Sequence, residues 1–171
     1  MKRLGVIIDS ISDWTGKTVR WLCVALILVA VWDVTLRYIF NAPTIWSYET
    51  SLMLGGTISV LGFSYVHRHH GHIRVDVFYA RLTEKGKQII DVLFASVFTM
   101  PLCIALTSMA FSWMLTAWAR AEVMAETSWY PPSGPFRTIV FIGLFLFSLQ
   151  ALAQLVRDFQ LLVRGGVASQ N

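Results

Sequence analysis

The sequence predicts an all-α integral membrane protein with four transmembrane helices, short amphipathic interfacial helices and both termini in the cytoplasm. The chain is 56% hydrophobic and carries only 14% charged residues, against about 25% in typical soluble domains. Its mean hydropathy is +0.59. A helix needs about 20 apolar residues to cross a bilayer core of about 30 Å. Spans are expected to be helical because lipid offers no hydrogen-bond partner to backbone N–H and C=O groups. Four runs meet this length, at residues 19–40, 48–66, 89–119 and 136–156.

The distribution of basic residues predicts the orientation. Short loops rich in Lys and Arg stay on the cytoplasmic side of the membrane. The two termini and the segment between the second and third runs hold most of these residues, namely Lys2, Arg3, Lys17, Arg20, Arg68, Arg74, Arg81, Lys85, Lys87, Arg157 and Arg164. The opposite side has Arg37, Arg120 and Arg137. This placement also explains the net charge of +4 without nucleic acid as a partner.

The segments flanking the first three runs are amphipathic. Residues 3–15 and residues 74–87 each alternate an apolar stripe with a polar face at helical spacing, which predicts interfacial helices on the inner leaflet. The first run is too long for a signal peptide and no small-residue cleavage site follows it, so it is expected to be retained. The whole chain, residues 1–171, is expected to form one membrane domain.

The third run and the outer loop after it contain prolines. Pro101 removes one backbone donor within residues 89–119, which predicts a kink. The loop from Arg120 to Arg137 contains Trp129, Tyr130 and consecutive prolines, which predict a stiff extended turn with aromatic side chains at the headgroup level.

Three charged residues lie near the outer end of the first two runs. Asp33 and Arg37 are four residues apart on one helical face, and a lone charge in a bilayer is costly, so they are expected to pair. Glu49 is expected at the start of the second span, within reach of Arg37. A structural charge network is the favoured interpretation, and a proton or ion pathway is the alternative.

The sequence contains no set of residues typical of catalysis, so no enzyme activity and no cofactor are expected. The four histidines, His67, His69, His70 and His72, cluster in a basic inner turn whose spacing matches no closed zinc site, although metal binding stays an alternative. None lies at bilayer depth, which disfavours a haem-bearing anchor. Cys23 and Cys103 both fall within predicted spans, so a disulfide is not expected.

Small and amide side chains form stripes on two of the predicted spans. Small residues four apart let helices approach closely, and buried amides hydrogen-bond to neighbouring helices. The stripes pack either within the chain or against another subunit; their members are Gly55, Ser59, Gly62, Gly143, Gln150 and Gln154.

Several short motifs occur in a characteristic order along the chain. Trp46 and Glu49 open the second span, His72, Arg74 and Asp76 lie in the inner loop, Trp129, Pro131 and Pro132 lie in the outer loop, and Gln150 lies in the fourth span. With four spans and cytoplasmic termini, the chain resembles the small permease subunit of tripartite ATP-independent periplasmic (TRAP) transporters over essentially its whole length. The histidines from His67 to His70 do not map onto that pattern.

The resemblance implies a subunit of a bacterial inner-membrane complex. A large multi-span permease subunit would carry an organic acid, such as a dicarboxylate or sialic acid, together with sodium, and a periplasmic binding protein would deliver it. The small subunit would be a scaffold that also helps dock the binding protein, with Glu122, Glu126 and Trp129 as candidate contacts. The competing hypotheses are an autonomous homo-oligomeric transporter that uses Asp33, Arg37 and Glu49, and a membrane anchor of a redox enzyme.

Overall fold

The structure is a computed structural model that describes residues 2–68 and 83–164. Within these ranges the chain is helical, which confirms the predicted all-α class. The helices are α1 (Lys2–Ile39), α2 (Ser47–Arg68), α4 (Glu84–Phe94), α5 (Met100–Ala119) and α6 (Ser133–Arg164), with a π-helical turn at Ala95–Thr99 between α4 and α5. The described non-helical segments pair only at one isolated bridge, between Val123 and Pro132.

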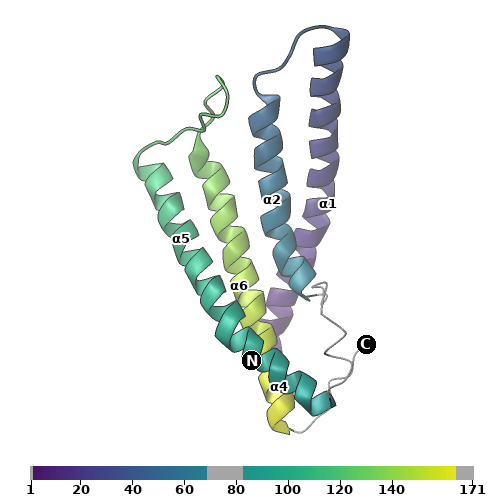
Figure 1. Cartoon of the computed structure of the whole chain (residues 1–171), viewed down its shortest axis with the longest axis vertical. Helices are drawn as coiled ribbons and strands as arrows, with labels where there is room; N and C mark the ends of the chain where they lie inside the picture. Colours follow the sequence, from purple (N-terminus) through teal and green to yellow (C-terminus); the bar gives the residue numbers. More distant parts are fainter. Residues whose placement is uncertain (1, 69–82, 165–171) are drawn as a thin grey trace.

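The four long helices lie in a row rather than in a closed bundle. Figure 1 shows them side by side in the order α5, α6, α2, α1. The packing agrees, because α2 contacts α1 and α6 extensively, α6 contacts α5, and α1 touches α6 only to a small extent. The two inner helices are therefore α2 and α6, and the outer helices α1 and α5 each have one packed flank.

The distribution of side chains is the reverse of that in a soluble protein. The fully buried apolar residues are small, namely Cys103, Ala110, Ala117 and Ala151, and they are accompanied by buried hydroxyl, amide and carboxyl groups. Large apolar residues lie outside: Trp21 is 77% exposed and Met109 is 70% exposed. Membrane helices pack through small and polar residues because lipid is as apolar as leucine. This arrangement requires an apolar solvent around the helices.

Three of the described helices are long and apolar enough to cross a membrane, at Asp13–Ile39, Ile89–Ala119 and Ser133–Gln160. The predicted second span, 48–66, coincides with α2 but is not among them. Its hydropathy is lowered by several Gly, Ser and Thr residues, of which Thr57 and Ser64 are buried. Figure 1 shows α2 running alongside α1 and α6.

The predicted interfacial segment 3–15 is continuous with the first span. Both belong to α1, whose 38 residues extend over about 57 Å at 1.5 Å per residue. That length exceeds a hydrocarbon core of about 30 Å, so the beginning of α1 extends beyond it or the helix is strongly tilted. Of the second predicted interfacial helix, 74–87, only the last residues are described, and residues 84–87 form the first turn of α4.

Glycines allow neighbouring helices to approach closely at two levels. A Cβ atom at Gly143 of α6 would lie 2.4 Å from Cγ1 of Val60 in α2. A Cβ atom at Gly16 of α1 would lie 2.3 Å from the ring of Tyr65 in α2. Both positions require glycine at these crossings, since real Cβ atoms do not approach heavy atoms so closely.

The π-helical turn accommodates the proline that the sequence placed in the third span. Met100 donates its backbone N–H to the carbonyl of Ala95, a five-residue step, directly before Pro101. Pro101 has no N–H to donate, and a π-turn is a known way to shift the backbone register at such a point. The apolar run 89–119 therefore consists of α4, the π-turn and α5 in sequence (Figure 1).

Candidate functional site at the polar end of the helices

Two connections lie at the same end of the row of helices, opposite the end where α1 begins and α6 ends (Figure 1). They are the α1–α2 turn, residues 40–46, and the loop between α5 and α6, residues 120–132, here called the outer loop. We call this region the polar end. The Asp33–Arg37 and Glu122–Arg137 ion pairs and the hydrogen bonds from Thr127 to Glu49 are found there.

Asp33 fixes the α1–α2 turn. Its Oδ2 accepts from Arg37 Nη2 at 2.8 Å, as the four-residue spacing predicted. Its Oδ1 accepts from the hydroxyls of Thr44 and Ser47, the latter at 2.7 Å. Both carboxylate oxygens are therefore engaged, and Ser47 is buried. The cluster joins the end of α1 to the start of α2.

Glu49 is not part of that cluster. It is fully buried, and its Oε1 accepts from the backbone N–H of Thr127 at 2.7 Å and from its hydroxyl at 2.9 Å. The predicted contact between Glu49 and Arg37 is therefore replaced by a contact with a residue 78 positions away. Glu49 Oε2 is buried and has no hydrogen-bond partner among the described residues. Glu49 ties the outer loop to the first turn of α2.

The outer loop is also held by its own backbone. After α5, Glu122 N donates to Ala117 O at 3.0 Å and Ala121 adopts a φ of 47°, the arrangement of a Schellman cap with alanine at the left-handed position. Met124 N then donates to Pro131 O at 2.8 Å, and Ser133 N donates to Glu122 O at 2.9 Å. These contacts close the loop on itself at the start of α6.

Arg137 connects α5, α6 and the outer loop. Its Nη1 lies 2.6 Å from Glu122 Oε2 and donates to the backbone carbonyl of Trp113 at 3.3 Å. Its guanidinium lies 4.2 Å from the centre of the Trp113 ring, a cation–π geometry. With 13% of its side chain exposed, Arg137 has its charge neutralised largely within the chain. Glu122 is correspondingly occupied.

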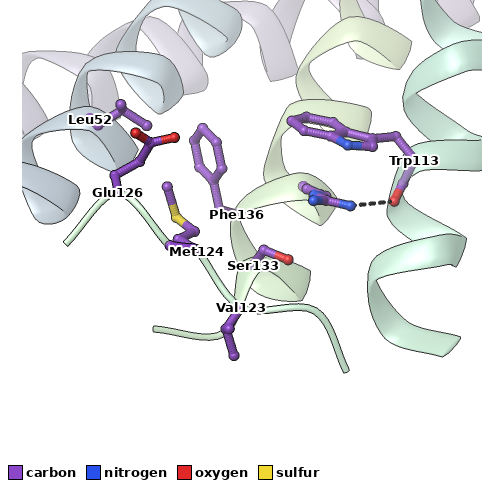
Figure 2. A pocket seen from close by; sticks show the side chains of 9 residues that line it. Leu52, Trp113, Val123, Met124, Glu126, Ser133 and Phe136 are labelled. Atoms are coloured by element: carbon purple, nitrogen blue, oxygen red, sulfur yellow. Dashed lines mark hydrogen bonds between the residues drawn. The ribbon is translucent and has the colours of Figure 1, made fainter. Parts of the chain in front are cut away.

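A pocket of about 280 Å³ lies between these elements (Figure 2). Figure 2 shows Leu52, Met124 and Phe136 around it, with the Glu126 carboxylate at one side and Trp113 at the other. The complete lining is Leu52, Trp113, Val123, Met124, Ala125, Glu126, Ser133, Phe136 and Arg137.

The other motif residues fall into three groups. Trp46 lies in the α1–α2 turn, where its carbonyl accepts from Thr50 at 2.8 Å, and Trp129 and Pro132 are exposed on the outer loop. Pro131 and Gln150 are buried. His72, Arg74 and Asp76 lie outside the described residues, as do His69 and His70 of the histidine cluster. His67 belongs to the last turn of α2.

The structure separates the predicted stripes of small residues into two sets. Cβ atoms added at Gly55 or Gly62 of α2 would meet nothing within 4 Å, and Ser59 between them is exposed. Gly143, by contrast, packs inside the chain against Val60. Gln154 hydrogen-bonds to Asp158 at 3.0 Å on its own helix. We call the face of α2 that carries Gly55, Ser59 and Gly62 the open small-residue face.

The sequence reasoning missed Thr127 and the Arg137–Trp113 contact. Thr127 lies in a loop without periodicity, so nothing in its neighbourhood indicates a distant acceptor. Arg137 and Trp113 are 24 residues apart on different helices. Within residues 2–68 and 83–164, no group of three metal-ligating side chains is found.

The fold is that of a multi-helix membrane protein with engaged ionised side chains at its polar end. The comparison with protein families narrows this class: residues 26–161 match the model of the DctQ component of tripartite ATP-independent periplasmic transporters. The match covers most of the chain, and the protein therefore belongs to the DctQ family. No curated protein matches the sequence. The family is a transporter component of the bacterial inner membrane and not an enzyme family.

Proposed function

We propose that this chain is the small membrane subunit that scaffolds the large permease subunit of a TRAP transporter and helps dock the periplasmic binding protein. The complex would import an organic acid, such as a dicarboxylate or a sialic acid, with sodium. Family membership supports the transporter assignment, and the open row of helices supports the scaffold role.

The observation that carries the scaffold role is the incomplete packing of α2. An inner helix of a self-sufficient bundle would be covered on all faces, yet the face of Gly55, Ser59 and Gly62 is open. Such small residues allow another helix to approach closely, and they offer little apolar area to lipid. We therefore assign this face to the large permease subunit.

The docking role is assigned to the polar end. The outer loop is held by Glu49 and by its own backbone, so it presents a fixed shape. Glu126 and Trp129 are exposed there, whereas Glu122 is engaged by Arg137. Of the predicted contacts with the binding protein, Glu126 and Trp129 therefore remain the better candidates.

The proposed orientation places the polar end in the periplasm and both termini in the cytoplasm, with α2 as the fourth span. Basic residues predominate toward the opposite end, which supports this orientation. The beginning of α1 and the end of α6 lie at that same opposite end.

An autonomous transporter that uses Asp33, Arg37 and Glu49 is less well supported. Asp33 has both oxygens engaged by donors of the α1–α2 turn, and Glu49 belongs to a different cluster. The two carboxylates therefore act as separate structural ties rather than as neighbouring carriers. For a redox anchor, the described part of the chain offers no group of three metal-ligating side chains as support.

The first test is purification of the tagged chain from its host in mild detergent. A stoichiometric large multi-span protein in the same complex is the expected result. Substituting Gly62→Trp should reduce its recovery, because a bulky side chain would block the open face of α2, whereas Trp21→Leu on α1 should not. Recovery of a homo-oligomer without any partner would contradict the proposal.

A further inference from the structure

The pocket at the polar end has one charge that none of the described residues neutralises. Arg137 is engaged by Glu122 at 2.6 Å and by Trp113. Glu126 is exposed and makes no ion pair or hydrogen bond with any described residue. With Arg137 and Glu122 cancelling, the pocket has an uncompensated negative charge at its Glu126 side (Figure 2).

The size and walls of the pocket indicate what kind of group fits. Its volume of about 280 Å³ is at or below the lower end of small-molecule sites, which span about 300–1,000 Å³. Leu52, Met124 and Phe136 provide apolar contact beside the carboxylate. A lysine or arginine side chain matches this combination, since its aliphatic stem packs on apolar surface while its cation stays at the rim.

We propose that this pocket receives a lysine or arginine side chain of the periplasmic binding protein, with Glu126 as its counter-ion. The inference rests on the proposed function, which places the polar end in the periplasm. Four of the nine lining residues, 123–126, belong to the outer loop, the part of the chain that a docked protein would meet. Arginine in a preformed pocket is a frequent anchor of protein interfaces.

The pocket is preformed, which reduces the entropic cost of docking. Glu49 holds the loop at Thr127, adjacent to Glu126. The Met124–Pro131 hydrogen bond holds the other side of the loop at 2.8 Å. Trp129 and Tyr130 are 43% and 57% exposed on the same loop, so they provide aromatic surface close by in the sequence.

The test measures the affinity of the binding protein for the complex of this chain and its large subunit in lipid nanodiscs. Glu126→Gln should raise Kd about threefold to tenfold, between the effects of an exposed and a buried ion pair. It should also weaken the dependence of the association rate on salt. Ser128→Lys is the matched control, because it changes the loop charge by the same amount at an exposed position outside the pocket lining. Its Kd should change less than about twofold.

A photo-crosslinking residue in place of Met124 identifies the occupant directly. The expected result is a crosslinked peptide of the binding protein that contains a Lys or Arg. Changing that residue to Glu should restore the affinity of the binding protein for the complex that carries Glu126→Lys. Crosslinks to lipid alone or to the large subunit alone would overturn the inference, as would an unchanged Kd for Glu126→Gln. If the wild-type complex fails to form or to bind the binding protein, the proposed function itself fails.

Discussion

Gly143→Ala tests whether α2 and α6 pack as closely as the structure shows. The new Cβ would lie 2.4 Å from Val60 Cγ1 and 3.1 Å from the backbone carbon of Val60, whereas ordinary contacts begin at 3.4 Å. Val60 cannot rotate away freely, because β-branched side chains have one preferred rotamer in a helix. The backbone carbon cannot move without its helix, so α2 and α6 must separate.

The expected cost combines two opposing effects. Overpacking of a tight contact destabilises by about 1–3 kcal/mol. Alanine regains up to about 1 kcal/mol of helix propensity over glycine. The net loss in the free energy of unfolding should therefore lie between about 0 and 2 kcal/mol. Unfolding of the isolated chain by sodium dodecyl sulfate in mixed micelles, followed by circular dichroism, measures this difference.

Gly62→Ala is the matched control for this measurement. It makes the same chemical change in the neighbouring helix, but at a position where a Cβ meets nothing within 4 Å. Its free energy of unfolding in the isolated chain should be unchanged or slightly higher. Equal effects of the two substitutions would refute the close approach of α2 and α6 at Gly143.

Three further substitutions probe the polar end by the same unfolding measurement. Thr127→Val removes one of the two donors to the buried Glu49 carboxylate and should destabilise by about 1–3 kcal/mol, and a neutral effect would argue against this tie. Ala121→Gly relieves the left-handed conformation at φ 47° and should stabilise by about 1 kcal/mol; destabilisation would contradict the Schellman cap. Arg137→Met leaves the Glu122 carboxylate unpaired in a partly exposed site and should lower the free energy of unfolding by about 1–3 kcal/mol. The loss should be smaller at high salt, because salt screens partly exposed charges.

The sequence was sufficient for features that depend on local composition. The apolar run 89–119 coincides with the span Ile89–Ala119, since length and hydropathy alone define it. The Asp33–Arg37 pair followed from spacing on one helix. Pro101 indicated an irregular helix at this point. The irregularity is a π-turn at Ala95–Thr99, which shifts the backbone hydrogen-bond register just before the proline that lacks an N–H donor.

Features that depend on the order of the helices were not predictable from the sequence. Periodicity does not reveal that α2 lies between α1 and α6, so its polar residues could not be divided into packed and open sets. For Gly143 the sequence left contact within the chain and contact with another subunit both open, and the structure packs it against Val60. Likewise, Glu49 was expected near Arg37 because the two are close in sequence, whereas its partner is in the outer loop.

The faces of α2 differ in what they contact, because α2 lies between α1 and α6. One face packs on α6 through Val60, and the first turn holds the outer loop through Glu49. The face of Gly55 and Gly62 is open. Glu49 in the first turn and the Gly and Ser residues of the open face lower the hydropathy of α2, which is not among the three helices long and apolar enough to cross a membrane. Small residues allow a neighbouring helix to approach closely, which is the physical basis for assigning the open face to the large permease subunit in the proposed function.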